Sequence, residues 1–320
     1  MLTAIRSNPA LLGSLSAVIA VVCFSVNDVV IKFLSGGYAL HQVVLIRAII
    51  SLVFLLTVFR PLSGGWAALR TRKLGWHIAR GACVVMANMT FFLGLAAMPL
   101  AEGVAIFFVS PLLITVFSVI FLREIVGPLR WSAIFVGLLG VLIVLRPGTA
   151  AFQWAALLPM LAAFGYAALH ILTRHIGKTE SALALAFYIQ VVFIVVALAM
   201  GLMFGRGQFG NQSDPSLAFL FRAWVWPDPH DLWIFLVIGA TSVTGGYFIS
   251  VAYRISEAAL VAPFEYAAMP LAVVWGLVVF GEWPDSVAMG GIALILGSGL
   301  FMIWRETLRG RTSLETPKRR

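Results

Sequence analysis

The sequence predicts an all-α polytopic membrane protein, with ten transmembrane helices arranged as two inverted five-helix repeats. Three observations lead to this fold class. Of the 320 residues, 61% are hydrophobic and only 11% are charged, and the mean hydropathy is +1.01, which is more apolar than soluble domains are. The apolar residues gather in segments of about the length that crosses a bilayer, roughly 20 residues. Finally, one pattern of residues occurs twice along the chain.

The predicted spans follow one another with short connections. They are residues 11–34, 41–59, 76–98, 101–122, 131–146, 153–174, 181–204, 232–253, 258–280 and 286–304. The first is too long for the core of a signal peptide and is expected to be a retained span. The fifth is short and ends at Arg146 and Pro147, because proline stops a helix. The polar stretches between the spans are too short to bury a core, so function must be carried within the bilayer.

The repeated pattern has two parts with the same offset. Pro111 opens an apolar run that ends near Glu124, and Pro270 opens one that ends near Glu282. The stretches 140–146 (GVLIVLR) and 299–305 (GLFMIWR) match as well. An odd number of spans in each copy inverts the second copy in the membrane, as in many secondary transporters. The expected division is a first repeat over 11–147, a second over 153–305 and a basic cytoplasmic tail over 306–320.

The positive charges predict the orientation. If the N-terminus is cytoplasmic, most Lys and Arg residues lie in cytoplasmic connections and in the tail, whereas Arg146, Arg206 and Arg222 lie outside. This bias predicts a multi-pass inner-membrane protein with both termini in the cytoplasm. It also accounts for the net charge of +9 without a nucleic-acid partner. Cys23 and Cys83 lie in apolar segments without pairing or metal spacing, so neither a disulfide, a zinc site nor a cofactor is expected.

Two stretches carry a resemblance to a known family. They are Ser110 to Glu124 with the following run from Gly137 to Pro147, and Met269 to Trp283 with the following glycines. In these the chain resembles the drug/metabolite transporter superfamily, specifically its EamA type, although the first copy has one residue more before its glutamate. The resemblance implies helices around a central cavity for a small-molecule substrate, with alternating access. It also implies peripheral fifth and tenth segments that contact a second copy in a homodimer.

Ionisable residues inside the spans are the first candidates for the site, because charge within hydrocarbon is costly. Glu265 lies in the ninth segment between Pro263 and Pro270, and it is expected to bind substrate or a proton, or else to pair with another helix. Asp28 and Lys32 share a helix face at i, i+4. They either neutralise each other or contribute to the cavity or its gate, with Asp28 the better candidate.

The other candidates for substrate binding are polar or aromatic residues within the spans. They are Asn27, Asn88, Phe108, His170, Tyr188, Gln190, Tyr247, Phe264, Tyr266 and Trp275. The uncharged polar residues could instead bridge helices, and a lone His is more often structural than functional. Several aromatic rings near a carboxylate would suit a flat solute.

Other conspicuous residues are expected to have architectural roles. Arg47 is interpreted as one half of a structural ion pair, with Asp28 or Glu265 as its alternative partners, and Arg80 as an interfacial anchor. Glu124 and Glu282 end their segments at opposite faces. The long connection after the seventh segment, with Trp224 and Trp226, is expected to be an interfacial connector rather than a lid.

The function predicted first is secondary transport of a small organic metabolite, an amino acid or a related compound, with proton coupling. The alternative is uptake of a flat cofactor such as riboflavin or S-adenosylmethionine, since EamA-type proteins move both kinds of solute. An ATP-driven pump is disfavoured because the chain has no GxxxxGK[ST] loop. An intramembrane enzyme is disfavoured because the His residues are scattered, and a channel because there is no filter motif.

Overall fold

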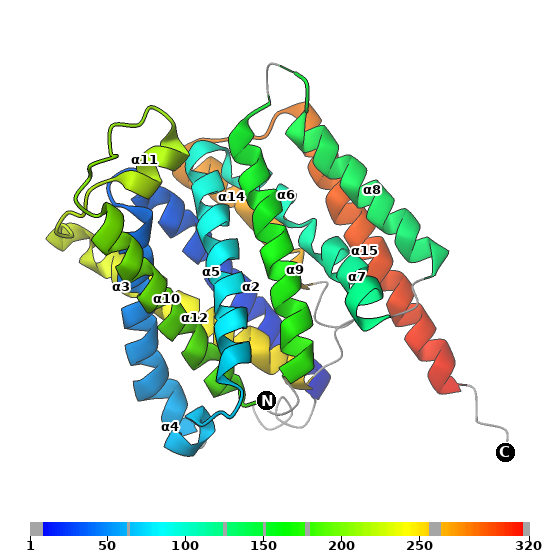
Figure 1. The fold of residues 1–320 in the computed structure, drawn as a ribbon. Helices are drawn as coiled ribbons and strands as arrows, with labels where there is room; N and C mark the ends of the chain where they lie inside the picture. Colours follow the sequence, from blue (N-terminus) through cyan, green and yellow to red (C-terminus); the bar gives the residue numbers. More distant parts are fainter. Residues whose placement is uncertain are drawn as a thin grey trace.

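The computed structural model describes residues 9–62, 65–123, 127–149, 152–176, 180–255 and 264–315, and in these ranges the chain is helical, without β-strands (Figure 1). Seven helices are long and apolar enough to cross a membrane, namely those within Leu12–Leu34, Leu40–Phe59, Leu74–Ala97, Leu100–Phe121, Trp154–Thr173, Ala182–Phe204 and Pro229–Ala252. Shorter apolar helices cover Trp131–Leu145, Ala268–Phe280 and Ser286–Phe301. The protein is therefore a multi-pass helical membrane protein, and the count of ten spans stays a prediction.

The main helices follow the predicted segments closely. They are α2 (Pro9–Leu34), α3 (Leu40–Phe54), α5 (Leu74–Ala97), α6 (Leu100–Phe107), α7 (Ser110–Leu122), α8 (Pro128–Leu145), α9 (Leu157–Ile176), α10 (Ala182–Phe204), α12 (Leu232–Ile255), α14 (Ala268–Phe280) and α15 (Ser286–Glu315). Short elements lie between them: the π-helical turn η1 (Leu55–Phe59), α4 (Arg60–Leu62), η2 (Gly65–Leu69), η3 (Trp154–Ala156), α11 (Pro215–Phe221) and η4 (Pro229–Asp231).

Two predicted segments differ from the structure in a way that the sequence explains. The fourth is broken between α6 and α7, because Pro111 in the first turn of α7 has no N–H and its ring excludes the carbonyl of Phe107. The tenth was predicted to end at residue 304, but α15 continues to Glu315. The predicted tail therefore begins as helix, because no proline or glycine pair stops α15 after the membrane segment.

Two helix ends carry unusual backbone conformations. Arg123 after α7 and Arg146 after α8 have φ of 56° and 49°, in the left-handed region, which costs non-glycine residues about 1–2 kcal/mol. Gly281 takes the same position after α14, with φ of 67°, and as a glycine it avoids this cost. The three turns end their helices sharply and direct the chain into the next segment.

The helices pack in crossing pairs from the two halves of the chain. In Figure 1, α2 lies against α12, α5 against α9, α3 against α10 and α8 against α15. Glycines allow the last pair to approach closely, because a Cβ added to Gly291 would lie 2.7 Å from the carbonyl oxygen of Gly140. Within a bilayer such close packing of small residues is a main source of helix association.

The upper end of the bundle in Figure 1 is covered by the segment that contains α11. Arg222 donates to the carbonyl of Ser35 at 2.8 Å, and the Tyr38 hydroxyl donates to Asp231 at 2.5 Å. The indole of Trp224 donates to His41 at 2.5 Å. These bonds fix the segment to the neighbouring α2–α3 connection and to α3, which fits a connector better than a mobile lid.

Candidate functional site

A buried arginine organises the polar residues in the middle of the bundle. Arg47 of α3 has 2% of its surface exposed. Its Nη1 donates to the Oδ1 atoms of Asn27 and Asn88, each at 3.3 Å. The guanidinium also lies over the rings of Phe92 and Phe193, at 5.4 and 4.8 Å from their centres, where a cation is attracted by the ring face. Asn27, Asp28, Arg47 and Asn88 are called the polar cluster below.

Asp28 supplies the negative charge of the polar cluster. Its carboxylate lies close enough to Arg47 for electrostatic attraction, and its side chain is only half-buried. Lys32, one turn later, points to Glu282 instead. The expectation that Asp28 and Lys32 neutralise each other is therefore wrong, whereas the alternative of Arg47 beside Asp28 agrees with the structure. Within the described ranges, no hydrogen bond reaches the Asp28 carboxylate.

A second group of residues surrounds Glu265, at the start of the described stretch that leads into α14. The Glu265 carboxylate acts electrostatically on the phenols of Tyr166 and Tyr266. Phe107 lies 5.3 Å from the ring centre of Tyr166, and Phe108 lies 5.3 Å from that of Tyr266. The structure thus brings a carboxylate and several aromatic rings together from the broken α6–α7 segment, α9 and the residues just before α14.

His170 and Arg80 lie beside this aromatic group. The His170 ring is 4.5 Å from Tyr166, edge to face, and the charge of Arg80 acts on it. Arg80 is buried, and its Nε donates to the Thr173 hydroxyl at 2.9 Å. The expectation of an interfacial anchor at Arg80 is therefore wrong, because the side chain turns toward α9 and finds a hydrogen-bond acceptor there instead of snorkelling to water.

Tyr266 and Phe108 are more buried than a substrate-contacting surface requires. Tyr266 has 3% of its surface exposed, and its ring fills the space above Gly299 of α15. A Cβ added to Gly299 would lie 2.1 Å from the Tyr266 hydroxyl oxygen. In this conformation the Tyr266 ring joins α15 to the aromatic group, so its contact with a substrate stays a prediction.

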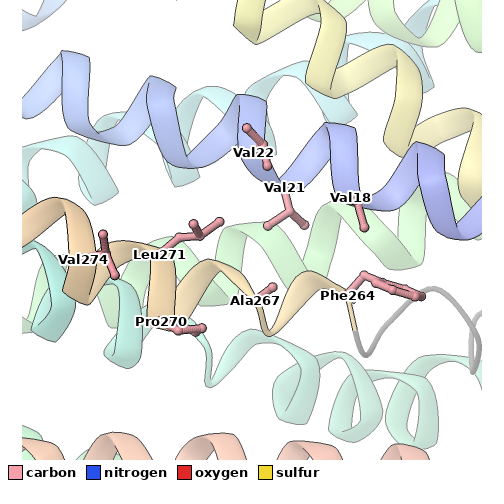
Figure 2. Close-up of a pocket in the computed structure, with 8 residues that line it drawn as sticks. All are labelled: Val18, Val21, Val22, Phe264, Ala267, Pro270, Leu271 and Val274. Atoms are coloured by element: carbon pink, nitrogen blue, oxygen red, sulfur yellow. The ribbon is translucent and has the colours of Figure 1, made fainter.

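An apolar groove runs between α2 and the stretch that includes α14 (Figure 2). Its volume is about 310 Å³, at the lower end of ligand sites. Its lining consists of Val18, Val21, Val22, Phe264, Ala267, Pro270, Leu271 and Val274. One turn beyond Val21, the indole Nε1 of Trp275 donates to the Ser25 hydroxyl at 3.3 Å. Phe264 and Trp275 thus lie along one α2–α14 contact, at the groove and just beyond it.

An ion pair joins α2 to the connection after α14 at the upper end. The Lys32 Nζ atom lies 2.8 Å from Glu282 Oε1 and 2.6 Å from the carbonyl oxygen of Met98. The other Glu282 oxygen accepts from the backbone N–H of Leu100 at 3.0 Å. We call Lys32 and Glu282 the upper ion pair. This pair links both halves of the chain, so Glu282 does more than end its segment, which was the role expected from sequence. Its predicted counterpart Glu124 lies outside the described residues.

Two of the predicted site residues, Tyr188 and Tyr247, lie elsewhere, and a third, Gln190, has no described partner for its side-chain oxygen. Tyr188 donates to the carbonyl of Leu69 and contacts His77 near the lower end of the bundle. Tyr247 stacks on Phe59 at 4.2 Å in a separate hydrophobic cluster. Gln190 is buried, and no hydrogen bond to its Oε1 is found among the described residues. The structure does not place Tyr188 and Tyr247 in the polar cluster or in the group around Glu265.

Sequence reasoning missed some members of the site. Ser25 lies three residues before Asp28 on the same face of α2, and that spacing is a signal that could have found it. Phe92 and Phe193 gave no signal, because an aromatic residue above a guanidinium looks like any other apolar residue in a span. Cys23 and Cys83 are free cysteines in the described ranges. In the described ranges no group of three His, Cys, Asp or Glu side chains could hold a metal ion.

Comparison with known proteins identifies the kind of molecule. Residues 11–146 match the EamA-like transporter family. The first part of the chain therefore carries an EamA-type domain, which confirms the predicted resemblance to the drug/metabolite transporter superfamily. It is similar to a riboflavin transporter of Rhizobium johnstonii, with 29% identity over 96% of both chains, and to one of Vibrio cholerae, with 29% identity over 96% of this chain and 97% of that one. An S-adenosylmethionine uptake transporter of Rickettsia prowazekii is 26% identical over 90% and 91%.

The EamA-type fold agrees with a solved structure too. One crystal structure superposes with a TM-score of 0.65 over 95% of this chain and 99% of that chain, at 18% identity. At this identity the likeness concerns the fold alone. Together with the apolar helices, the family makes the chain a multi-pass membrane transporter of a small molecule.

Proposed function

We propose that this EamA-type protein is an uptake carrier for a flat, nitrogen-containing heterocyclic cofactor of the riboflavin kind. The observation that carries the proposal is the half-buried Asp28 carboxylate, which accepts no described hydrogen bond and lies one helix turn after Ser25, the partner of the Trp275 indole. A flat heterocycle offers both an N–H group for the carboxylate and a face for the indole. The similarity to riboflavin transporters over almost the whole chain points in the same direction.

The flat cofactor replaces an amino acid as the first candidate for physical reasons. A free amino acid carries an ammonium and a carboxylate, which call for a separated negative and positive site. In the polar cluster Asp28 and Arg47 lie close enough to act on each other electrostatically, so each charged end of an amino acid would meet a like charge next to its opposite charge. S-Adenosylmethionine has the same ends, but similarity to transporters of that compound keeps it as a competitor.

The transport mechanism that we propose is alternating access by two inverted repeats, 11–147 and 153–305, in the inner membrane with both termini in the cytoplasm. The packing supports this division. When each helix in a contact is replaced by its counterpart in the other repeat, the result is again a contact that the structure shows. The α2–α12 contact becomes α9–α5, the α2–α14 contact becomes α9–α7, and the α3–α10 and α8–α15 contacts become themselves. Proton coupling through Glu265 or Asp28 and dimer contacts through α8 and α15 belong to the same proposal.

The test is uptake of radiolabelled riboflavin by cells that lack their own riboflavin synthesis and carrier. Expression of the wild-type chain should give saturable uptake, and Asp28→Asn should reduce it at least tenfold. Arg206→Met, which removes an exposed charge far from the site, is the matched control and should change nothing. Saturable uptake of S-adenosylmethionine or of an amino acid, without uptake of riboflavin, would contradict the proposed substrate class.

A further inference from the structure

The hydrogen bonds within the polar cluster determine which groups remain for a ligand. The amide oxygen of Asn88 accepts from both Nη atoms of Arg47, at 3.3 Å each. Because a guanidinium only donates, the Asn88 oxygen must face it, and the NH₂ group of Asn88 is directed away from it. In the described ranges no hydrogen bond uses that NH₂ group, and Asn88 is half-buried. Asn88 therefore offers donors.

The other members of the cluster complete the pattern. Both polar side-chain atoms of Asn27 are engaged, since its oxygen accepts from Arg47 and its nitrogen donates to the carbonyl of Ile238 at 3.1 Å. Asp28 offers a carboxylate, which only accepts. The Nε of Arg47 is buried, and no hydrogen-bond partner for it is found in the described part of the chain. The cluster thus presents acceptors on Asp28 and donors on Asn88, and two of the five N–H donors of Arg47, one on Nε and one on Nη2, have no described partner.

We propose that the polar cluster recognises the cyclic imide edge of a flat heterocycle, in which a ring N–H lies between two carbonyl oxygens. The N–H donates to the Asp28 carboxylate, and a flanking carbonyl accepts from the Asn88 NH₂ group. The second carbonyl accepts a hydrogen bond from an N–H group of Arg47 that has no described partner. The inference rests on the proposed function and names the part of the cofactor that determines specificity.

The electrostatics of the cluster favour an uncharged edge. A cationic group at Asp28 would lie close to Arg47, and an anionic group at Arg47 would lie close to Asp28, so a like charge opposes either. A neutral imide meets neither repulsion and satisfies groups that would otherwise stay unpaired in a medium of low polarity. The Asp28 carboxylate makes the central hydrogen bond charge-assisted, which is the stronger kind.

The apolar groove lies further along the same α2–α14 contact and would take the rest of a tricyclic ring. Ser25, which holds the Trp275 indole, is one turn before Asp28 on the same helix face. Val21, one further turn back, lines the apolar groove. Asp28 and Val21 are separated by about 10 Å along the helix axis, close to the length of three fused rings. With its imide at Asp28, the ring would lie past Trp275 and place its apolar end in the groove (Figure 2).

The experiment compares riboflavin with its 3-methyl derivative, in which a methyl group replaces the imide hydrogen. The wild-type carrier in proteoliposomes should transport 3-methylriboflavin about 10- to 100-fold less efficiently, the range for loss of one charge-assisted hydrogen bond. An analogue with its extra methyl group on the benzenoid ring controls for size and should be transported well. In Asn88→Asp and Asp28→Asn the preference for riboflavin over 3-methylriboflavin should fall toward one. Thr90→Val is the matched control on α5, since the described hydrogen bonds of the Thr90 hydroxyl stay within that helix.

Each result decides the proposal. Equal transport of riboflavin and 3-methylriboflavin by the wild-type chain would overturn the inference and leave the proposed function intact. If folded variants of the cluster exclude 3-methylriboflavin as strongly as the wild-type chain does, imide recognition lies elsewhere. This result would also overturn the inference. No riboflavin transport by the wild-type chain would remove the proposed function and this inference together. If a variant fails to fold, the wild-type comparison of the analogues still decides.

Discussion

Removal of the upper ion pair should open the upper end of the carrier. Lys32 holds Glu282 at 2.8 Å and also holds the Met98 carbonyl. In this way it ties the first half of the chain to the connection between α14 and α15. Lys32→Met keeps the length of the side chain and removes its charge. Glu282 would then retain only the N–H of Leu100 as a described partner, and α2 would lose its described polar link to the connection between α14 and α15.

The structure sets the size of the effect. The side chains of Lys32 and Glu282 are 9% and 29% exposed, so the pair lies between a fully buried ion pair and a surface one. We take about 1.5–3 kcal/mol, the value of a hydrogen bond between charged groups. Breaking a fully buried ion pair costs about 3–5 kcal/mol, and the upper limit of our range meets the lower limit of that one. The population of the conformation open at the upper end should therefore rise about 10- to 100-fold.

Thiol labelling measures this population. Cys23→Ala and Cys83→Ala remove the native thiols, and Ser25→Cys places one on the buried α2–α14 contact below the ion pair. A membrane-impermeant maleimide added outside intact cells should label this thiol 10- to 100-fold faster in Lys32→Met than in the parent. A thiol at Val18, in the groove, should become less reactive from the cytoplasmic side at the same time.

Two further variants sharpen the assay. Glu282→Gln keeps an acceptor for the Leu100 N–H and should give a smaller increase than Lys32→Met. Arg206→Met removes a positive charge from an exposed position at the same end and should leave labelling unchanged. If Lys32→Met folds normally, as judged by size-exclusion chromatography, and Ser25→Cys is labelled at the parental rate, the ion pair does not hold the upper end closed.

Two other predictions concern stability in detergent. Gly291→Ala should destabilise the protein by about 1–3 kcal/mol, because its Cβ would clash with the facing α8 backbone. Gly290→Ala is the control and should leave stability unchanged, because a Cβ there meets nothing within 4 Å. Equal melting temperatures for the two variants would contradict the packing. The hydrogen bond from Arg146 lowers the pKa of Asp285 below its ordinary value of 3.8. Its stabilising effect is therefore complete above pH 4 and is lost as the pH falls through the lowered value. Asp285→Asn keeps an oxygen that can cap α15 through Ala288 and should remove this acid-dependent part of the melting curve; an unchanged curve would contradict it.

The sequence predicted the helical class and most helix positions, because long apolar runs and prolines are local signals. The end of the fifth segment at Arg146 was predicted within one residue. The continuation of α15 to Glu315 was not predicted, because a charged helix outside the membrane has no apolar pattern that separates it from a tail.

The candidate site was predicted less completely, because partners of charged residues depend on contacts between distant segments. Asp28 and Lys32 share a helix face, yet Lys32 pairs with Glu282, which is 250 residues away in the chain. Arg80 was expected at the interface because it is close to a span end, but it donates a hydrogen bond to the Thr173 hydroxyl of another helix. Individual polar residues can be chosen from the sequence, whereas the assignment of their partners requires the packed helices.

The juxtaposition of Asp28 and Arg47 also bears on how the membrane potential acts on the carrier. With both groups ionised, the two charges would compensate each other within the cluster, and movement of the cluster relative to the field would transfer little net charge. Binding of an uncharged solute there leaves that balance unchanged, and voltage dependence would then report protons or other coupled ions alone. Asp28→Asn would leave a positive charge uncompensated. A potential of 100 mV acts on one elementary charge with about 2.3 kcal/mol if the charge crosses the whole field, so this single substitution should make solute movement sensitive to voltage.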